Sequence, residues 1–363
     1  MRKVDFLLAS GGSGGHVFPA EALADVLASR GRKVGYVTTE RGRNFAAMKT
    51  LPIWQVMAAG VAGRGFGRRL ISYGKLAIGL AQAVILLIRL RPRVVVGFGG
   101  YAGVPVLAAA CLLHRKIVLH EQNAVLGRAN RLFSGKASLI AATFPLTHEK
   151  SLKTNVIVTG NPVRVSFHEL AFRPYRPPQS DGRFALVVTG GSQGTHVFSD
   201  ILPPALAALP PHLRNRLEIV QQCRHEDVAR VKEFYAQAEI KAEISAFFNN
   251  LAARLDHSHL AICRSGASTI TELTTAGMPS ILVPYPFATD GHQSANARFL
   301  SDAKAAWVIE QPEFTVRKLS ELMQLLMTNP QHLVDYAANA RRLGVPNAAG
   351  HLADLVEIVG DVK

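Results

Sequence analysis

Hydrophobic and polar positions follow two periodicities along this chain. Short apolar runs rich in β-branched residues alternate with longer stretches in which apolar residues return every three or four positions. This alternation is typical of βαβ units, whose strands form parallel sheets, so the sequence predicts an α/β fold. The predicted strands are 4–8, 34–38, 93–98, 116–120, 184–189, 218–222, 260–263 and 280–283, and the clearest predicted helices are 17–29 and 70–90.

One motif occurs twice, once in each half of the chain. Residues 6–18 (FLLASGGSGGHVF) resemble residues 186–198 (LVVTGGSQGTHVF), and each combines an apolar strand, a glycine turn and the entrance to a helix. No fixed-period array accompanies the pair, so we interpret it as two domains of one type. The boundary is predicted near 158–164, where Gly-Asn-Pro interrupts regular structure.

Composition narrows the possible partners. The formal net charge is +15, which favours nucleic acid, an anionic membrane surface or a phosphorylated substrate. Aromatic residues make up 7% of the chain and no zinc-knuckle or RRM-like pattern occurs, so nucleic acid is the weakest of the three. The three cysteines are far apart without a CxxC pair, which indicates a reducing compartment and neither a disulfide framework nor a metal cluster.

Two apolar segments resemble membrane signals but are interpreted otherwise. The N-terminal run is short, contains Asp5 and leads into a glycine loop, so it predicts a first strand and not a signal peptide. The longest apolar stretch, 76–90, is interrupted by Gln82 and Arg89. It falls below the roughly 18–20 residues that cross a bilayer, so no membrane-spanning segment is expected.

The first glycine loop, Gly11–His16, is the leading candidate site. Glycine between a strand and a helix lets the backbone approach a ligand and directs N–H groups at negative charge. The GxGxxG dinucleotide pattern fails at Val17, although Glu40 after the next strand keeps a nicotinamide cofactor possible. A purely structural turn is the other alternative. His16 is either a general base near neutral pH or a helix-entrance histidine bonded to backbone.

Polar side chains also follow other predicted strands. The run from His120 to Asn123 is costly to bury without partners, and a substrate-facing cluster is favoured over a structural network. Ser265 and Ser268 suit capping of the following helix, and Glu272 is either a ligand for ribose hydroxyls or a first-turn acid. Gln293 and Asn296 are helical neighbours able to hold sugar hydroxyls, and Gly97–Gly103 forms another glycine loop after a strand.

Together these segments strongly resemble the MurG family of glycosyltransferases. The matching pieces occur in the family's order and cover about residues 4–300. They are 11–19, 99–101, 120–123, 160–164, 190–194, 264–267 with Glu272, and Gln293 with Asn296.

The resemblance implies a GT-B architecture, in which two Rossmann-like domains face each other across a cleft. The first domain would comprise residues 1–161, completed by a returning helix at about 342–363, and would bind acceptor and membrane. The second, residues 164–341, would bind UDP-N-acetylglucosamine. The implied reaction is an inverting transfer of N-acetylglucosamine to the 4-hydroxyl of N-acetylmuramic acid on undecaprenyl diphosphate, from lipid I to lipid II. That step belongs to peptidoglycan synthesis, and so to cell-wall growth, cell shape and cell division.

The resemblance also implies roles for individual residues, without metal or cofactor. His16 would lie on the acceptor side as candidate base or diphosphate contact, and Glu272 would hold the ribose. Asn123 would contact the donor sugar, as would Gln293 with Asn296, and Phe248 would back the uracil. Arg164 and Ser192 would bind the donor diphosphate. The remaining substrate-binding candidates are Ser13, Gly14, Gly15, Ala267, Ser268, Thr269 and His292; among them, Ser13 stands where threonine is usual and His292 where glutamine can occur.

The repeat assigns the two glycine loops to different substrates. The twin at 190–194 is the better candidate for the UDP diphosphate, so Gly11–His16 is expected to be an acceptor site. Basic residues flank the apolar helix over about 64–91, which suits peripheral attachment to an anionic leaflet; a core helix with snorkelling ends is the alternative. The resemblance implies that this leaflet is the cytoplasmic face of the bacterial plasma membrane. The alternatives are another UDP-sugar transferase of this fold, a UDP-N-acetylglucosamine epimerase and a non-catalytic nucleotide-sugar sensor.

Overall fold

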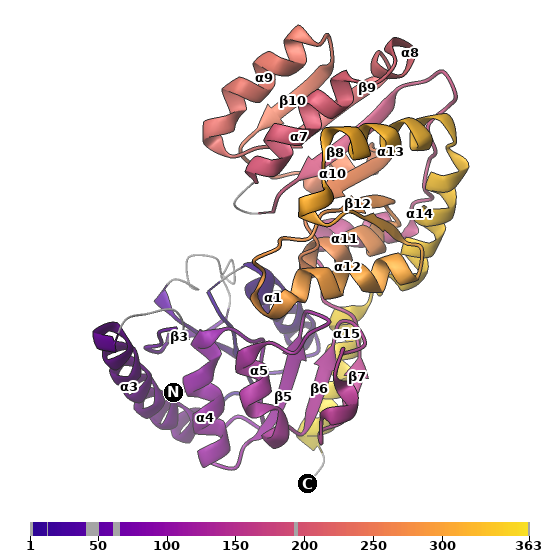
Figure 1. Ribbon diagram of the computed structural model, residues 1–363. Helices are drawn as coiled ribbons and strands as arrows, with labels where there is room; N and C mark the ends of the chain where they lie inside the picture. The colour runs from indigo at the N-terminus through magenta and orange to yellow at the C-terminus, as the bar shows by residue number, and fades with distance from the viewer. Residues whose placement is uncertain (1–2, 13, 41–50, 61–65, 192–194, 362–363) are drawn as a thin grey trace. The chain divides into compact units, whose positions relative to one another are not determined.

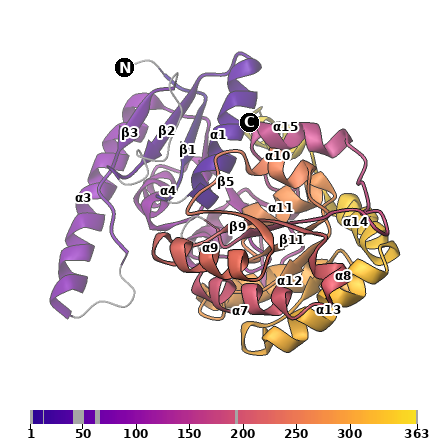
Figure 2. The same cartoon turned by 90° about the horizontal axis from the view of Figure 1, so that it is seen from above.

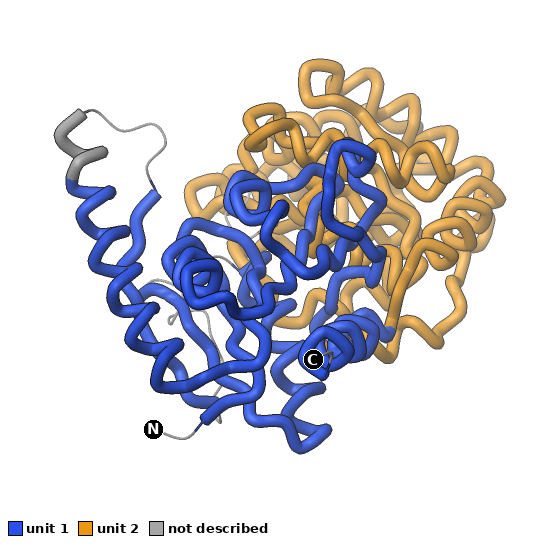
Figure 3. Tube along the Cα trace, turned by 90° about the horizontal axis from the view of Figure 1, so that it is seen from below, with its two compact units in different colours: residues 1–164, 347–363 blue, residues 165–346 orange. Residues whose placement is uncertain are grey.

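The chain folds into two α/β units (Figure 1), seen in a computed structural model that describes residues 3–12, 14–40, 51–60, 66–191 and 195–361. Unit 1 comprises residues 1–164 and 347–363, and unit 2 comprises residues 165–346. Figure 3 shows both segments of unit 1 in blue. The C-terminal segment therefore belongs to the amino-terminal unit.

Unit 1 is built on a seven-stranded sheet in the order β3-β2-β1-β4-β5-β6-β7, with every described pairing parallel. Its strands are β1 (Phe6–Ala9), β2 (Val34–Thr38), β3 (Ile53–Gln55), β4 (Val94–Gly97), β5 (Lys116–Glu121), β6 (Leu139–Ala142) and β7 (Val156–Val158). Its helices are α1 (Gly14–Ser29), α3 (Phe66–Leu90), α4 (Val104–Leu112), α5 (Arg128–Phe133) and α15 (Ala348–Asp361).

Both faces of this sheet are buried, because successive side chains of a strand point to opposite sides. Leu7 and Ala9 of β1 pack in one cluster with residues of α3 and α4. Phe6 and Leu8 pack in another with α1 and α15. Each face therefore has its own hydrophobic layer, and β1, the third of the seven strands, contributes side chains to both.

Unit 2 repeats the design with a six-stranded parallel sheet in the order β10-β9-β8-β11-β12-β13. Its strands are β8 (Phe184–Thr189), β9 (Leu217–Gln222), β10 (Lys241–Ser245), β11 (Leu260–Cys263), β12 (Ser280–Leu282) and β13 (Ala306–Val308). Its helices are α6 (Val165–His168), α7 (His196–Ala207), α8 (Pro211–Arg214), α9 (Val228–Gln237), α10 (Leu251–Asp256), α11 (Ala267–Ala276), α12 (His292–Asp302), α13 (Val316–Thr328) and α14 (Gln331–Leu343).

Helix α3 departs from the sequence expectation. The predicted apolar stretch began at residue 76, whereas α3 is 25 residues long and its segment Ile71–Leu90 is long and apolar enough to cross a membrane by length and composition alone. The apolar stretch 76–90 was too short an estimate because the apolar pattern begins at Ile71, before Leu76. One face of α3, with Ala83, Leu87 and Leu90, lies in the unit 1 core beside α4, along the flank of the sheet seen in Figure 2.

Candidate functional site

In each unit the order of the strands across the sheet has one switch point, where strands later in sequence lie on opposite sides of the same strand. In unit 1 β1 lies between β2 and β4, and in unit 2 β8 lies between β9 and β11. Ligands of open α/β sheets bind at the carboxyl ends of strands beside such a switch point. The glycine loop after β1 and its repeat after β8 both lie there. Ser13 in the first loop and Ser192 in the second are outside the described residues.

Two glycine loops meet at the switch point of unit 1. A Cβ atom on Gly100, whose φ is 74°, would lie only 2.9 Å from the Cα of Gly11. The backbones after β1 and β4 therefore touch, and only glycine permits this approach. The imidazole of His16, in the first turn of α1, packs against both glycines. Gly14 and Gly15 begin the same helix, so they adjoin His16 directly.

The polar run at the end of β5 forms a buried network, which corrects the preference for a substrate-facing cluster. His120, Glu121 and Gln122 are each at most 3% exposed. The carboxylate of Glu121 accepts hydrogen bonds from Asn123 N at 3.0 Å, Asn123 Nδ2 at 3.3 Å, Gly127 N at 2.8 Å and Asn130 Nδ2 at 2.8 Å. Asn123 alone in the run is half-buried. The sequence analysis predicted that these polar groups need hydrogen-bond partners if they are buried. The structure provides those partners from other residues of the protein.

Gln122 connects His16 to this network. Its Oε1 lies 3.1 Å from His16 Nδ1, and its Nε2 lies 3.1 Å from the Phe98 carbonyl oxygen and 3.0 Å from His120 Nδ1. Burial lowers the pKa of His120 to about 4, so this ring is neutral at pH 7. The role of Gln122 was missed because nothing in the sequence pairs it with a residue 106 positions earlier.

Arg164 is the last residue of the first segment of unit 1. Its guanidinium carbon lies 5.8 Å from the centroid of the Phe18 ring, which is on α1 two residues after His16. A cation over an aromatic face is attracted by the ring quadrupole. Within unit 1, Gln122 contacts His16 and adjoins Asn123 in sequence, while Arg164 contacts Phe18 of the helix that carries His16.

Helices α11 and α12 of unit 2 carry most of the predicted donor-binding residues. Ala267, Ser268 and Thr269 form the first turn of α11, where unpaired backbone N–H groups favour an anion. Glu272 is buried in the next turn. Ser265 does not cap the helix as predicted, because its hydroxyl donates to the Gln293 carbonyl oxygen at 2.9 Å. Gly266 is the N-cap residue without a side-chain cap bond, so Ser268 does not cap either.

The α12 residues are held by the loop that precedes α11. Asn296 is fully buried and its Nδ2 donates to the Ser265 carbonyl oxygen at 3.1 Å. The side-chain oxygen of Gln293 accepts from Tyr285 N at 2.9 Å, and His292 Nδ1 lies 2.8 Å from the Thr289 carbonyl oxygen. The predicted proximity of Gln293 and Asn296 holds, but both amides also have structural partners.

Arg264, just before α11, is a buried cation without a carboxylate partner in the described contacts. Its guanidinium donates to the carbonyl oxygens of Val283 and Pro284 at 3.0 and 3.1 Å and to Thr195 Oγ1 at 2.9 Å. Burial lowers its pKa to about 10, which leaves it charged at pH 7. Arg264 thereby ties the loop after β12 to the residue that precedes α7.

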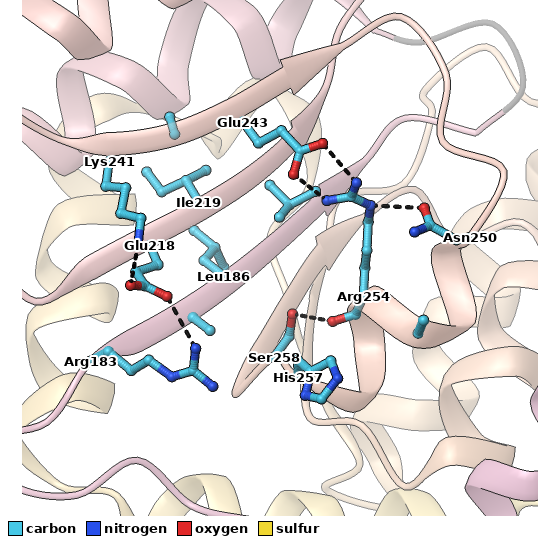
Figure 4. A pocket seen from close by; sticks show the side chains of 14 residues that line it. Arg183, Leu186, Glu218, Ile219, Lys241, Glu243, Asn250, Arg254, His257 and Ser258 are labelled. Atoms are coloured by element: carbon cyan, nitrogen blue, oxygen red, sulfur yellow. Dashed lines mark hydrogen bonds and ion pairs between the residues drawn. The ribbon is translucent and has the colours of Figure 1, made fainter.

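Phe248 follows β10 and has a basic side chain against its ring. The guanidinium carbon of Arg254 lies 4.3 Å from the ring centroid, while its nitrogens donate to both oxygens of Glu243, at 2.5 and 2.7 Å, and to Asn250. Figure 4 shows Arg254 with Glu243 and Asn250 on the wall of a groove of about 450 Å³. That groove includes none of the predicted site residues; residues of β8, β9, β10 and α10 line it.

A second missed residue, Gln222, bridges two loops of unit 2. Its Nε2 donates to the carbonyl oxygens of Gly191 and Ala246, at 3.0 and 3.1 Å, and its Oε1 accepts from Thr189 Oγ1 at 2.8 Å. Gln222 thereby links Gly191, which follows β8, to Ala246, which precedes Phe248 in the loop after β10. A polar residue ending an apolar strand was the available signal. Among the described residues no group of three metal-ligating side chains is found.

Comparisons with known proteins agree with these features. Residues 6–142 match the model of the glycosyltransferase family 28 N-terminal domain, and residues 185–352 match that of the glycosyltransferase family 28 C-terminal domain. Two curated relatives are each named UDP-N-acetylglucosamine--N-acetylmuramyl-(pentapeptide) pyrophosphoryl-undecaprenol N-acetylglucosamine transferase. The one from Rhodospirillum rubrum is 48% identical, covering 98% of this chain and 92% of its own length, and the one from Rhodospirillum centenum is 46% identical, covering 98% and 94%.

Solved structures give the same result for the fold. The crystal structure of Acinetobacter baumannii MurG is 32% identical, with a TM-score of 0.80 over 97% of this chain and 99% of that one. This neighbour and the two parallel-sheet units confirm the GT-B fold class expected from the sequence. A UDP-N-acetylglucosamine 2-epimerase from Listeria monocytogenes has a TM-score of 0.67 at 12% identity, which is a likeness of fold alone.

Proposed function

Because this chain belongs to the MurG family within glycosyltransferase family 28, we propose that it transfers N-acetylglucosamine from UDP-N-acetylglucosamine to lipid I, yielding lipid II. The observation that carries the proposal is the similarity, over nearly the whole chain, to relatives whose names state this reaction. The cell process is then peptidoglycan synthesis.

In the proposed step the 4-hydroxyl of the acceptor N-acetylmuramic acid attacks the anomeric carbon of the donor. A new C1–O4 bond forms, the C1–O bond to the diphosphate breaks, and UDP leaves with the bonding electrons. The hydroxyl proton passes to His16, whose Nδ1 is engaged by Gln122 so that Nε2 is the basic nitrogen. Attack opposite to the leaving group inverts the anomeric configuration.

Unit 1 is proposed to take the acceptor and unit 2 the donor. The loop with Ser13, Gly14 and Gly15 would receive the acceptor diphosphate beside His16. In unit 2 the α11 entrance (Ala267, Ser268 and Thr269) would bind donor phosphate oxygens with backbone N–H groups. The remaining donor contacts proposed are Arg164 and Ser192 on the diphosphate, Glu272 on the ribose, Phe248 on the uracil, and Asn123, His292 and Gln293 on the sugar, with Asn296 supporting Gln293 from the core.

The test is turnover with both substrates. Purified protein, labelled UDP-N-acetylglucosamine and lipid I should yield lipid II, and no product would refute the proposal. UDP-N-acetylmannosamine formed without any acceptor would favour the epimerase alternative, and UDP binding without turnover would favour the sensor. His16→Ala should lower turnover by about 10²–10⁴-fold if His16 is the base. Glu272→Ala should instead weaken donor affinity.

We also propose that α3 attaches the enzyme peripherally to the cytoplasmic face of the plasma membrane. The face of α3 opposite its buried side exposes Ile78, Ile85 and Ile88, each at least 50% exposed, and Lys75 is exposed beside them. Apolar side chains enter the interface and basic ones meet anionic lipid. Arg64 is outside the described residues.

Co-sedimentation with vesicles tests the attachment. The enzyme should bind phosphatidylglycerol vesicles more tightly than phosphatidylcholine vesicles and should be released by salt. Replacing Ile85 and Ile88 by Ser should weaken binding at least about tenfold, since each loses apolar burial of roughly 1.5–3 kcal/mol. Ile358→Ser, on the exposed side of α15, is the matched control. Equal loss in both variants would contradict the attachment through α3.

A further inference from the structure

The orientation of the Gln122 amide is determined by its neighbours. The Phe98 carbonyl oxygen lies 3.1 Å from Nε2 and the His120 carbonyl oxygen 3.4 Å. Carbonyl oxygens only accept hydrogen bonds, so the amide nitrogen must be the atom on that side. The amide oxygen therefore faces His16, at 3.1 Å from Nδ1. An oxygen that only accepts requires a proton on His16 Nδ1.

His120 supports the same orientation. Its Nδ1 lies 3.0 Å from Gln122 Nε2 and its Nε2 lies 3.4 Å from the Gly160 carbonyl oxygen. The carbonyl oxygen accepts, so Nε2 carries the proton and Nδ1 accepts from the amide. The ring is fully buried and its pKa is lowered to about 4, so it keeps this neutral form at physiological pH. Gly160, His120, Gln122 and His16 are linked in this order by three hydrogen bonds. Each of these bonds thus has only one possible donor and one possible acceptor.

We propose that Gln122 is a positioning residue that fixes His16 in the tautomer with the proton on Nδ1 and the lone pair on Nε2. The inference rests on the proposed function in one respect, namely that His16 takes the acceptor proton. Neutral imidazole in water prefers the opposite tautomer, with the proton on Nε2, which could not accept a proton there. The tautomer of a catalytic histidine is set by the hydrogen bond of its other nitrogen. Gln122 thereby keeps Nε2 basic before substrate arrives.

The tautomer can be measured directly by NMR of protein labelled with ¹⁵N in histidine. A His16→Asn variant assigns the His16 signals by their absence. Wild-type His16 should show a protonated Nδ1 and an unprotonated Nε2. Gln122→Met, which keeps the side-chain length without the amide, should shift the ring toward the Nε2–H form. A wild-type ring protonated on Nε2, or a tautomer unchanged in Gln122→Met, would overturn the proposal. Unchanged signals from the histidines other than His16 and His120, whose ring also contacts the Gln122 amide, establish that the variant is folded.

Kinetics provides the second readout. Gln122→Met should lower turnover roughly tenfold or more, without changing UDP affinity. Gln55→Met, at the exposed last residue of β3 in the same unit, is the matched control and should leave the rate unchanged.

The two hypotheses fail in different ways. Added to His16→Ala, the Gln122→Met change should have no further effect on turnover, because Gln122 acts through His16. Additive losses would overturn the positioning role. A His16→Ala enzyme within about tenfold of wild type would instead overturn the proposed base, whatever tautomer the NMR spectrum records.

Discussion

Replacing Glu121 by Gln changes the buried network of unit 1 by one atom. In the protein both carboxylate oxygens accept, Oε1 from Asn123 N and Nδ2, Oε2 from Gly127 N and Asn130 Nδ2. The glutamine must direct its NH₂ group at one of these pairs. The less costly choice faces Asn123, whose side-chain amide can rotate to present its oxygen. The backbone N–H of Asn123 then has no acceptor, and its side chain is reversed.

The magnitude follows from these contacts. An orphaned buried N–H costs about 1–3 kcal/mol, and the two remaining bonds lose their charge assistance, about 0.5–1 kcal/mol each. Burying a neutral amide costs less free energy than burying a carboxylate, and this difference offsets roughly 1 kcal/mol of the lost stability. We therefore expect Glu121→Gln to lower the free energy of unfolding of unit 1 by about 1–4 kcal/mol. Turnover should fall as well, because the reversed Asn123 offers the donor sugar its NH₂ group in place of the oxygen that the native side chain directs away from Glu121.

Tryptophan fluorescence isolates the affected unit, since Trp54 belongs to unit 1 and Trp307 to unit 2. In a Trp307→Phe background, urea unfolding followed through Trp54 reports unit 1. Glu149→Gln, at an exposed position of the same unit, should change the free energy of unfolding by less than about 0.5 kcal/mol. If Glu121→Gln behaves like this control, the carboxylate does not organise the loop and the reasoning is wrong.

Three further predictions concern other parts of the molecule. Arg254→Met should raise the donor KM about 3–10-fold at unchanged kcat, because the ring proposed to back the uracil loses its cation. Gly100→Ala should destabilise unit 1 by about 1–3 kcal/mol more than Gly31→Ala, since both have positive φ but only the first Cβ would meet backbone; equal urea midpoints would contradict this. Burial lowers the pKa of His120 and His259 to about 4, so the unfolded chain binds more protons between about pH 6.5 and 4; stability should fall as pH falls through that window, and a flat urea midpoint would contradict it.

The strands at the centre of each sheet could be predicted from the sequence because both of their faces are buried. Residues 34–38 and 260–263 were predicted with their observed bounds. β3 and β10 lie at sheet edges and were not predicted, since half-exposed strands of three to five residues lack a continuous apolar run. The fold class could be predicted from the order of the sequence motifs, because that order does not depend on the contacts of individual side chains.

The partners of polar groups could not be predicted in the same way. The sequence placed His120, Glu121 and Gln122 after a buried strand, but their orientation depends on Phe98, Gly160 and other segments far away along the chain. Arg254 gave no signal at all, because a basic residue in a short helix is ordinarily solvated. Its contact with Phe248 exists only because α10 turns back toward the loop after β10.

The position of α15 has a consequence for synthesis of the protein. Leu352 and Val356 of α15 share a cluster with Phe6 and Leu8 of β1, and ion pairs from Arg30, just after α1, to Asp354 and Glu357 join α15 to the helix on the same face. Strand β1 is thus covered by a helix that is synthesised only after the whole of unit 2. While unit 2 is being translated, one face of the nascent sheet of unit 1 lacks that cover and exposes apolar surface to chaperones or aggregation. A nonsense codon before residue 347 would therefore damage the half of the protein that had already been made.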